Sequence, residues 1–126
     1  MTPDIKLARR AVACKGWRWL PGMLNGRDET RYMGALLWAW QDPYRHHALG
    51  IEIADWPDLS DPCTLGGLLA LVREAWGDDR ISSVANVVYG TWMILMPDDA
   101  ASDGWRLIGC ATTEAEALVA ALEAAP

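Results

Sequence analysis

The chain has 126 residues, of which 52% are hydrophobic and 22% charged, and this ordinary globular composition excludes a disordered or fibrous protein. We expect a single domain over residues 1–126, long enough to bury a core without disulfides. The net charge of -6 is unevenly divided: residues 1–50 carry eight Lys or Arg against four Asp or Glu, and residues 51–126 carry three against thirteen. An acidic chain without zinc-ligand or helix-turn-helix motifs is not typical of nucleic-acid-binding proteins, so nucleic acid is not expected as a direct partner.

Three sequence features indicate the cellular compartment. Charged residues interrupt the N-terminal apolar residues, unlike the continuous apolar run of a signal peptide. The longest uncharged stretch, residues 81–97, contains polar residues and Gly90 and predicts strands rather than a membrane span. The odd set Cys14, Cys63 and Cys110 lacks disulfide or metal spacing. We therefore expect a cytoplasmic protein without membrane association, metal or cofactor.

The first predicted helix lies within residues 2–16. Thr2 is suited to cap it, Pro3 to fill its first position, and Gly16 to follow its last turn. The helical spacing puts three apolar side chains on one face: Ile5, Ala8 and Val12.

Two strands are predicted next, at residues 32–40 and 47–55. Alternation puts Leu36, Trp38 and Trp40 on one face of the first strand. The second strand has a corresponding face formed by His47, Leu49, Ile51 and Ile53, with Glu52 opposite. The short connection between them predicts a hairpin.

The second predicted helix is bounded by Asp61 as N-cap, followed by Pro62, and by Gly77 at its end. Gly66 and Gly67 each weaken it by about 1 kcal/mol, or else allow close approach of another element. The expected buried stripe consists of Leu65, Leu68, Leu69, Val72 and Trp76.

The remaining segments predict three strands, at residues 83–89, 91–97 and 104–111, with a tight turn at Gly90 and an Asp-rich loop at 98–104. A capping box from Thr113 to Glu116 then begins a third helix. Its expected buried stripe is Leu118, Ala121, Leu122 and Ala125. The element order α-β-β-α-β-β-β-α predicts an α/β (α+β) fold, in which three helices cover an antiparallel sheet of four to five strands.

Candidate catalytic and metal-binding residues are few. His46 and His47 would point to opposite sides of a strand, so they do not form an adjacent metal-ligand pair. Cys63 lies near the start of a predicted helix, where the N-H groups favour a thiolate, and a pairing with either histidine is conceivable. The glycine spacing of phosphate-binding loops is absent. We expect no enzyme, with a cysteine-dependent enzyme kept as an alternative.

The segment "ACKGWRWLPGM", residues 13–23, is the best candidate binding surface. In one interpretation, Trp17 packs back onto the last turn of the first helix near Val12, and Trp19 points the same way. In the other, this corner recognises a partner, because Trp and Arg are frequent interface anchors. The candidate surface comprises Arg9, Arg10, Lys15, Trp17, Arg18 and Trp19.

Three blocks carry a resemblance to known proteins: "ARRAVACKGWRWLPGM", "LSDPCTLGGLLALVREAWG" and "EAEALVAALEAAP". They resemble a family of small phage and prophage proteins with no assigned chemistry. The element order is also similar to that of the phage ABA sandwich domains. These resemblances imply a phage origin and a function inside an infected bacterium, in the host cytoplasm.

The sequence leads to three hypotheses about function. The first is a non-enzymatic, phage-encoded protein that binds a host or phage protein, for example as an inhibitor of a bacterial defence system of the anti-CRISPR kind. The second is a small-ligand or nucleotide-binding sponge, in which Trp rings stack on a base and arginines bind phosphate. The third is an enzyme that uses Cys63.

Overall fold

The computed structural model describes residues 5–27, 29–32 and 56–126. These residues contain three helices and a three-stranded antiparallel sheet of order β1-β2-β3, so the α+β class is confirmed. The strand expected at residues 47–55, and that at 32–40 except for Tyr32, lie outside the described residues, so a sheet of four to five strands stays a prediction. The elements are α1 (Ile5–Val12), α3 (Pro62–Trp76), β1 (Ser82–Asn86), β2 (Thr91–Pro97), β3 (Trp105–Ala111) and α4 (Glu114–Glu123).

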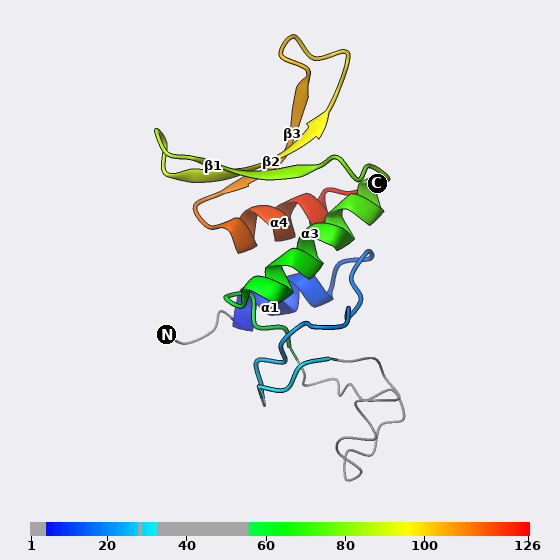
Figure 1. Ribbon diagram of the computed structural model, residues 1–126, viewed down its shortest axis with the longest axis vertical. Helices are drawn as coiled ribbons and strands as arrows, with labels where there is room; N and C mark the ends of the chain where they lie inside the picture. Colours follow the sequence, from blue (N-terminus) through cyan, green and yellow to red (C-terminus); the bar gives the residue numbers. More distant parts are fainter. Residues whose placement is uncertain (1–4, 28, 33–55) are drawn as a thin grey trace.

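Helix α4 lies between the sheet and the other two helices (Figure 1). As the capping box predicts, the side chain of Thr113 accepts a hydrogen bond from the N-H of Glu116 at 3.2 Å. Because α4 contacts the sheet on one side and α1 and α3 on the other, it buries more residues than the single stripe predicted from the sequence. Its buried residues are Ala117, Leu118, Val119, Ala121 and Leu122.

Strand β3 approaches α4 very closely at Gly109. A Cβ atom on Gly109 would lie 2.4 Å from the carbonyl oxygen of Ala117 and 3.0 Å from the Cβ of Ala121. Only a glycine against alanines allows the two backbones to come this near. At this point the strand and helix meet through small residues, while larger side chains such as Ile108 and Leu118 belong to the same hydrophobic core.

Helix α3 has the predicted boundaries. Asp61 accepts a hydrogen bond from the N-H of Thr64 at 3.0 Å, and Gly77 ends the helix at φ 70°. Gly67 packs against Met23, whereas the space around Gly66 is open, so the predicted close approach is confirmed at Gly67 alone. Of the expected stripe, Leu68 and Val72 are buried and Leu65, Leu69 and Trp76 are half-buried.

Helix α1 ends at Val12, earlier than expected. The prediction that Val12 shares the buried face is wrong, because its side chain is 38% exposed and the helix buries Leu7, Ala8 and Ala11. Gly16 follows the helix without the left-handed conformation of a C-cap. A Cβ on Gly16 would lie 3.2 Å from side-chain atoms of both α3 and α4, so its role is close packing.

Strand β1 ends at Asn86, so the predicted strand over residues 83–89 is too long. The side chain of Asn86 accepts hydrogen bonds from the N-H groups of Val88, at 3.2 Å, and Tyr89, at 3.4 Å. This local turn interrupts the strand, and Gly90, at φ 66°, completes the connection to β2. The β-branched pair Val87-Val88 therefore lies in the turn instead of the sheet.

Candidate functional site

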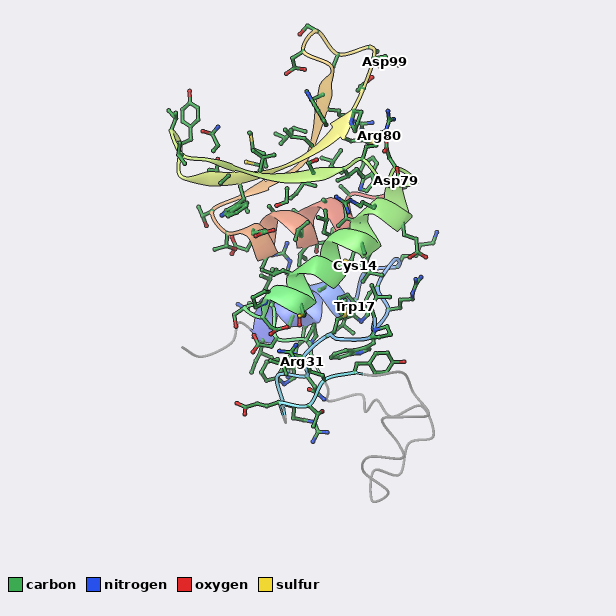
Figure 2. All side chains as sticks on the ribbon, viewed as in Figure 1. Cys14, Trp17, Arg31, Asp79, Arg80 and Asp99 are labelled. Carbon is green, nitrogen blue, oxygen red and sulfur yellow. The ribbon has the colours of Figure 1, made fainter. Side chains whose placement is uncertain are left out.

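The corner at residues 17–22 has the predicted alternation of side chains. Trp17 and Trp19 are both half-buried against the hydrophobic core, and Arg18 is exposed. The two indole rings meet edge to face, with centroids 5.8 Å apart, and Trp19 also stacks obliquely on Tyr32 at 6.2 Å. A turn at Pro21 and Gly22, the latter at φ 96°, reverses the chain after the rings. Figure 2 shows Trp17 between the ends of the helices and the loop that carries Arg31.

Two cations of the predicted binding surface are paired with other helices. Arg10 contacts Glu123 of α4 at 2.6 Å, and this hydrogen bond holds the pKa of Glu123 below its usual value. Arg18 forms an ion pair with Glu74 of α3. Arg9 and Lys15 are exposed on the same segment. The corner thus presents less positive charge than the sequence alone indicates.

A groove of about 540 Å³ lies beside this corner, where α1 ends next to α3 and α4. Cys14 lines it, and its thiol donates a weak hydrogen bond to the carbonyl oxygen of Arg10 at 3.3 Å. Burial raises the pKa of the Cys14 thiol, which therefore stays protonated at neutral pH and is a poor nucleophile. Lys15 and the Arg10–Glu123 pair give the groove charged walls of both signs.

The proposed cysteine chemistry is not assembled in the described residues. Cys63 lies in the first turn of α3 and is exposed. His46 and His47, its conceivable partners, lie outside the described residues. Within those ranges no group of three or more His, Cys, Asp or Glu side chains could hold a metal ion. In the same part of the chain, no helix is both long and apolar enough to cross a membrane.

The sheet has a second apolar face that the sequence reasoning missed. Ile94 and Gly109 are register partners and point toward α4, where both are buried. Because successive side chains alternate, their neighbours Met93 and Cys110, also register partners, point away from α4. Val84 of β1 pairs with Met93 and extends this row across all three strands. The outer face is therefore largely apolar in β2 and β3, whereas in β1 the polar Ser82 and Asn86 flank Val84 on this face.

This outer face is solvent-exposed. Leu107, paired with Leu95, is 53% exposed, and Trp105 and Val84 are 42% and 39% exposed. We call the residues of this surface the sheet patch: Val84, Met93, Leu95, Trp105, Leu107 and Cys110.

Next to the sheet patch, the turn between β1 and β2 exposes further large apolar side chains. Val87, Val88 and Tyr89 are 90%, 81% and 80% exposed, and we call them the hairpin tip. They follow directly on the end of β1, one strand of the patch. The sheet patch, in which Met93 and Leu95 are half-buried, and the hairpin tip lie on either side of Asn86 and together form one largely apolar surface.

Carboxylates flank the opposite end of the sheet patch. The loop between β2 and β3 carries Asp98, Asp99 and Asp103. The hydrogen bond to Asp78, at 3.2 Å, raises the pKa of Arg80, and the charges of Asp79 and Asp99 add smaller contributions in the same direction. Figure 2 places Asp79, Arg80 and Asp99 along the same side of the molecule. The aspartates outnumber the two arginines at this end of the sheet, Arg80 and Arg106, and leave it acidic.

One feature of the sequence, the apolar run of strand β2, indicates that the sheet patch is present. Strand β2, "TWMILMP", is a nearly continuous apolar run, which is typical of a strand covered on both faces rather than on one. In the described residues, α4 covers one face.

A comparison of the chain with protein-family models, curated proteins and solved structures finds no match.

Proposed function

We propose that this chain is a non-enzymatic, phage-encoded protein that binds a host or phage protein and inhibits a bacterial defence system in the cytoplasm of the infected cell. The observation that carries the binding role is the exposed apolar surface formed by the sheet patch and the hairpin tip. Contiguous apolar surface of this kind marks interaction sites in small soluble domains. The phage origin and the defence system rest on the sequence resemblance.

Charge favours a protein over other macromolecules as the partner. The chain has a net charge of -6, and the acidic loop at residues 98–104 adjoins the apolar surface. Such a field repels nucleic-acid phosphates and anionic lipid headgroups. The fully buried centre of a protein interface is typically apolar, depleted of charged residues and enriched in aromatic residues and methionine.

The proposal is tested by expressing the chain in bacteria with an active CRISPR system and counting phage plaques. The native chain should raise the plating efficiency, and Val88→Asp should abolish the rise, because a carboxylate at the hairpin tip opposes apolar docking. Val12→Asp, an exposed valine on α1, is the control and should retain the effect. Melting temperatures of both variants establish that they are folded.

Two results would contradict the proposal. If the native chain leaves plating unchanged, the inhibition of this defence system is wrong. If Val88→Asp inhibits as well as the native chain, the hairpin tip does not carry the binding.

The groove beside Cys14 favours a second candidate, a small-ligand or nucleotide-binding protein. Its volume of about 540 Å³ suits a small ligand, and Lys15 offers a cation for a phosphate group. A nucleotide that binds there should raise the melting temperature of the native chain but not of Lys15→Glu. A screen in which no nucleotide shifts the native melting temperature would remove this candidate.

A further inference from the structure

We propose that the sheet patch docks a cationic amphipathic helix of the partner protein. This inference rests on the proposed protein-binding function and names the chemistry of the bound segment. A sheet with two apolar faces is most readily covered by a helix on each face. Helix α4 covers the inner face, and Val84, Leu107 and Trp105 are left exposed on the outer one.

The dimensions of the sheet set the length of the docked helix. Strand β2 has seven residues, which extend about 23 Å at the usual rise of a strand. A helix of about 15 residues spans the same distance. Its apolar side chains would lie over the cross-strand row Val84, Met93 and Cys110 and the neighbouring pair Leu95 and Leu107.

The charges beside the patch indicate the chemistry of the docked helix. Residues 81–97, which include β1, the hairpin tip and β2, contain no charged side chain. At the other end, Asp98, Asp99 and Asp103 lie in the loop that joins β2 to β3. Lysine or arginine at one end of the docked helix complements this loop.

The acidic loop at residues 98–104 also disfavours binding of a second copy of this chain to the sheet patch. Two copies packed through their sheet patches bring two surfaces of a chain with net charge -6 together, each with its own acidic loop. Like charges at an interface oppose association. A basic partner segment meets no such repulsion.

Cys110 provides a direct readout, because its thiol lies in the sheet patch and is exposed. Cys63, exposed at the start of α3, is an internal reference on the same chain. The probe is a synthetic 15-residue peptide with leucines at helical spacing and three lysines in its last turn, where cations do not oppose the helix dipole. The control peptide has three glutamates in place of these lysines. Alkylation of each cysteine by iodoacetamide is followed by mass spectrometry.

We expect the lysine peptide at saturation to slow alkylation of Cys110 at least about fivefold without changing Cys63, and the glutamate peptide to have less than about a twofold effect. Val84→Glu should remove the protection. Val12→Glu should keep it and is closely matched, since the native valines are 39% and 38% exposed. The double variant Asp99→Asn/Asp103→Asn should weaken lysine-peptide binding about fivefold, as expected for two exposed charges.

Several outcomes would overturn the inference. Equal protection by both peptides contradicts the role of charge, and protection of Cys110 by anionic lipid vesicles contradicts a protein partner. Protection that rises with the concentration of the chain alone, and is lost in Val84→Glu, identifies a self-interface. If neither peptide protects Cys110 while Val88→Asp still abolishes inhibition in cells, the helix is wrong and the proposed function stands. If wild-type inhibition is also absent, both fail.

Discussion

Arg31 joins Asp61 through two parallel hydrogen bonds of 2.9 Å each. The same guanidinium donates to the carbonyl oxygen of Gly22 at 3.0 Å, and the same carboxylate caps α3 by accepting from the N-H of Thr64. The side chain of Asp61 is only 9% exposed, so water screens this ion pair less than a surface one. Asp61 thereby fixes both the start of α3 and the loop that follows the tryptophan corner.

Removal of the Asp61 charge should lower stability in a pH-dependent way. The hydrogen bonds from Arg31, and then those from Thr64, lower the pKa of Asp61 from 3.8 to about 2. Because the folded pKa lies below the unfolded one, the stabilisation is present above about pH 4 and is lost as the pH falls toward 2. Because the Arg31 side chain is 45% exposed and water weakens the pair, Asp61→Asn should lower the free energy of unfolding at pH 7 by about 1 kcal/mol, measured by urea denaturation.

The control for this prediction is Glu74→Gln, which breaks the exposed pair with Arg18. Exposed pairs contribute about 0–1 kcal/mol, so this variant should remain close to the native stability. An Asp61→Asn protein that loses as much stability at pH 2 as at pH 7 would show that the ion pair does not account for the effect.

Gly109 and Gly66 should respond oppositely to alanine. In Gly109→Ala the new Cβ meets a backbone carbonyl of α4 at 2.4 Å, which should cost about 1–3 kcal/mol or more. Gly66→Ala adds a methyl group inside α3 where, apart from the neighbouring backbone of the helix, no atom lies within 4 Å, and it should stabilise the protein by about 1 kcal/mol. Thermal unfolding of the two variants measures both signs. A neutral Gly109→Ala would show that β3 and α4 can separate without cost.

The sequence predicts α3 and α4 well because interactions between residues close in sequence set the boundaries of both helices. Asp61, Gly77 and Thr113 act within a few residues of themselves, so their side-chain chemistry is sufficient. The sequence predicts that Gly16 directly follows the last turn of α1. In the structure, Gly16 instead allows a close approach to residues of α3 and α4 that are distant in sequence. The early end of β1 depends on the side chain of Asn86, a local signal that the β-branched residues after it concealed.

The candidate site was predictable only in part, because some of its contacts join residues that are distant in sequence. The alternation of Trp17, Arg18 and Trp19 follows from an extended backbone, and the structure confirms it. The pairing of Arg18 with Glu74 joins residues 56 positions apart and requires the tertiary fold. The sheet patch also required it, because an apolar strand does not reveal which of its faces another element covers.

Trp76 should contribute to stability through its N-H as well as its ring. Its Nε1 donates to the carbonyl oxygen of Ala121 at 2.8 Å, in the last turn of α4. Trp76→Phe keeps an aromatic ring near Arg106, which lies 5.4 Å from the indole centroid, but leaves that carbonyl unpaired. The cost should be about 1–3 kcal/mol in chemical denaturation.

Trp92→Phe is the matched control for Trp76→Phe. Trp92 is also half-buried against the core, and the described residues provide no acceptor for its N-H. This variant loses a similar ring area without a hydrogen bond and should therefore be the less destabilised of the two. Equal losses would assign the effect of Trp76→Phe to packing alone.

The corner formed by Trp17, Arg18 and Trp19 should stabilise the protein mainly through its two indole rings. Both rings pack against the core and against each other, so Trp17→Ala and Trp19→Ala should each lower the free energy of unfolding by about 3 kcal/mol. Arg18→Ala removes an exposed ion pair and should change it by less than about 1 kcal/mol. Trp17→Phe should cost less than Trp17→Ala, because the buried Nε1 of Trp17 has no hydrogen-bond partner among the described residues. If the corner instead binds the partner, Arg18→Ala and one of the Trp→Ala variants will weaken partner binding at an unchanged melting temperature.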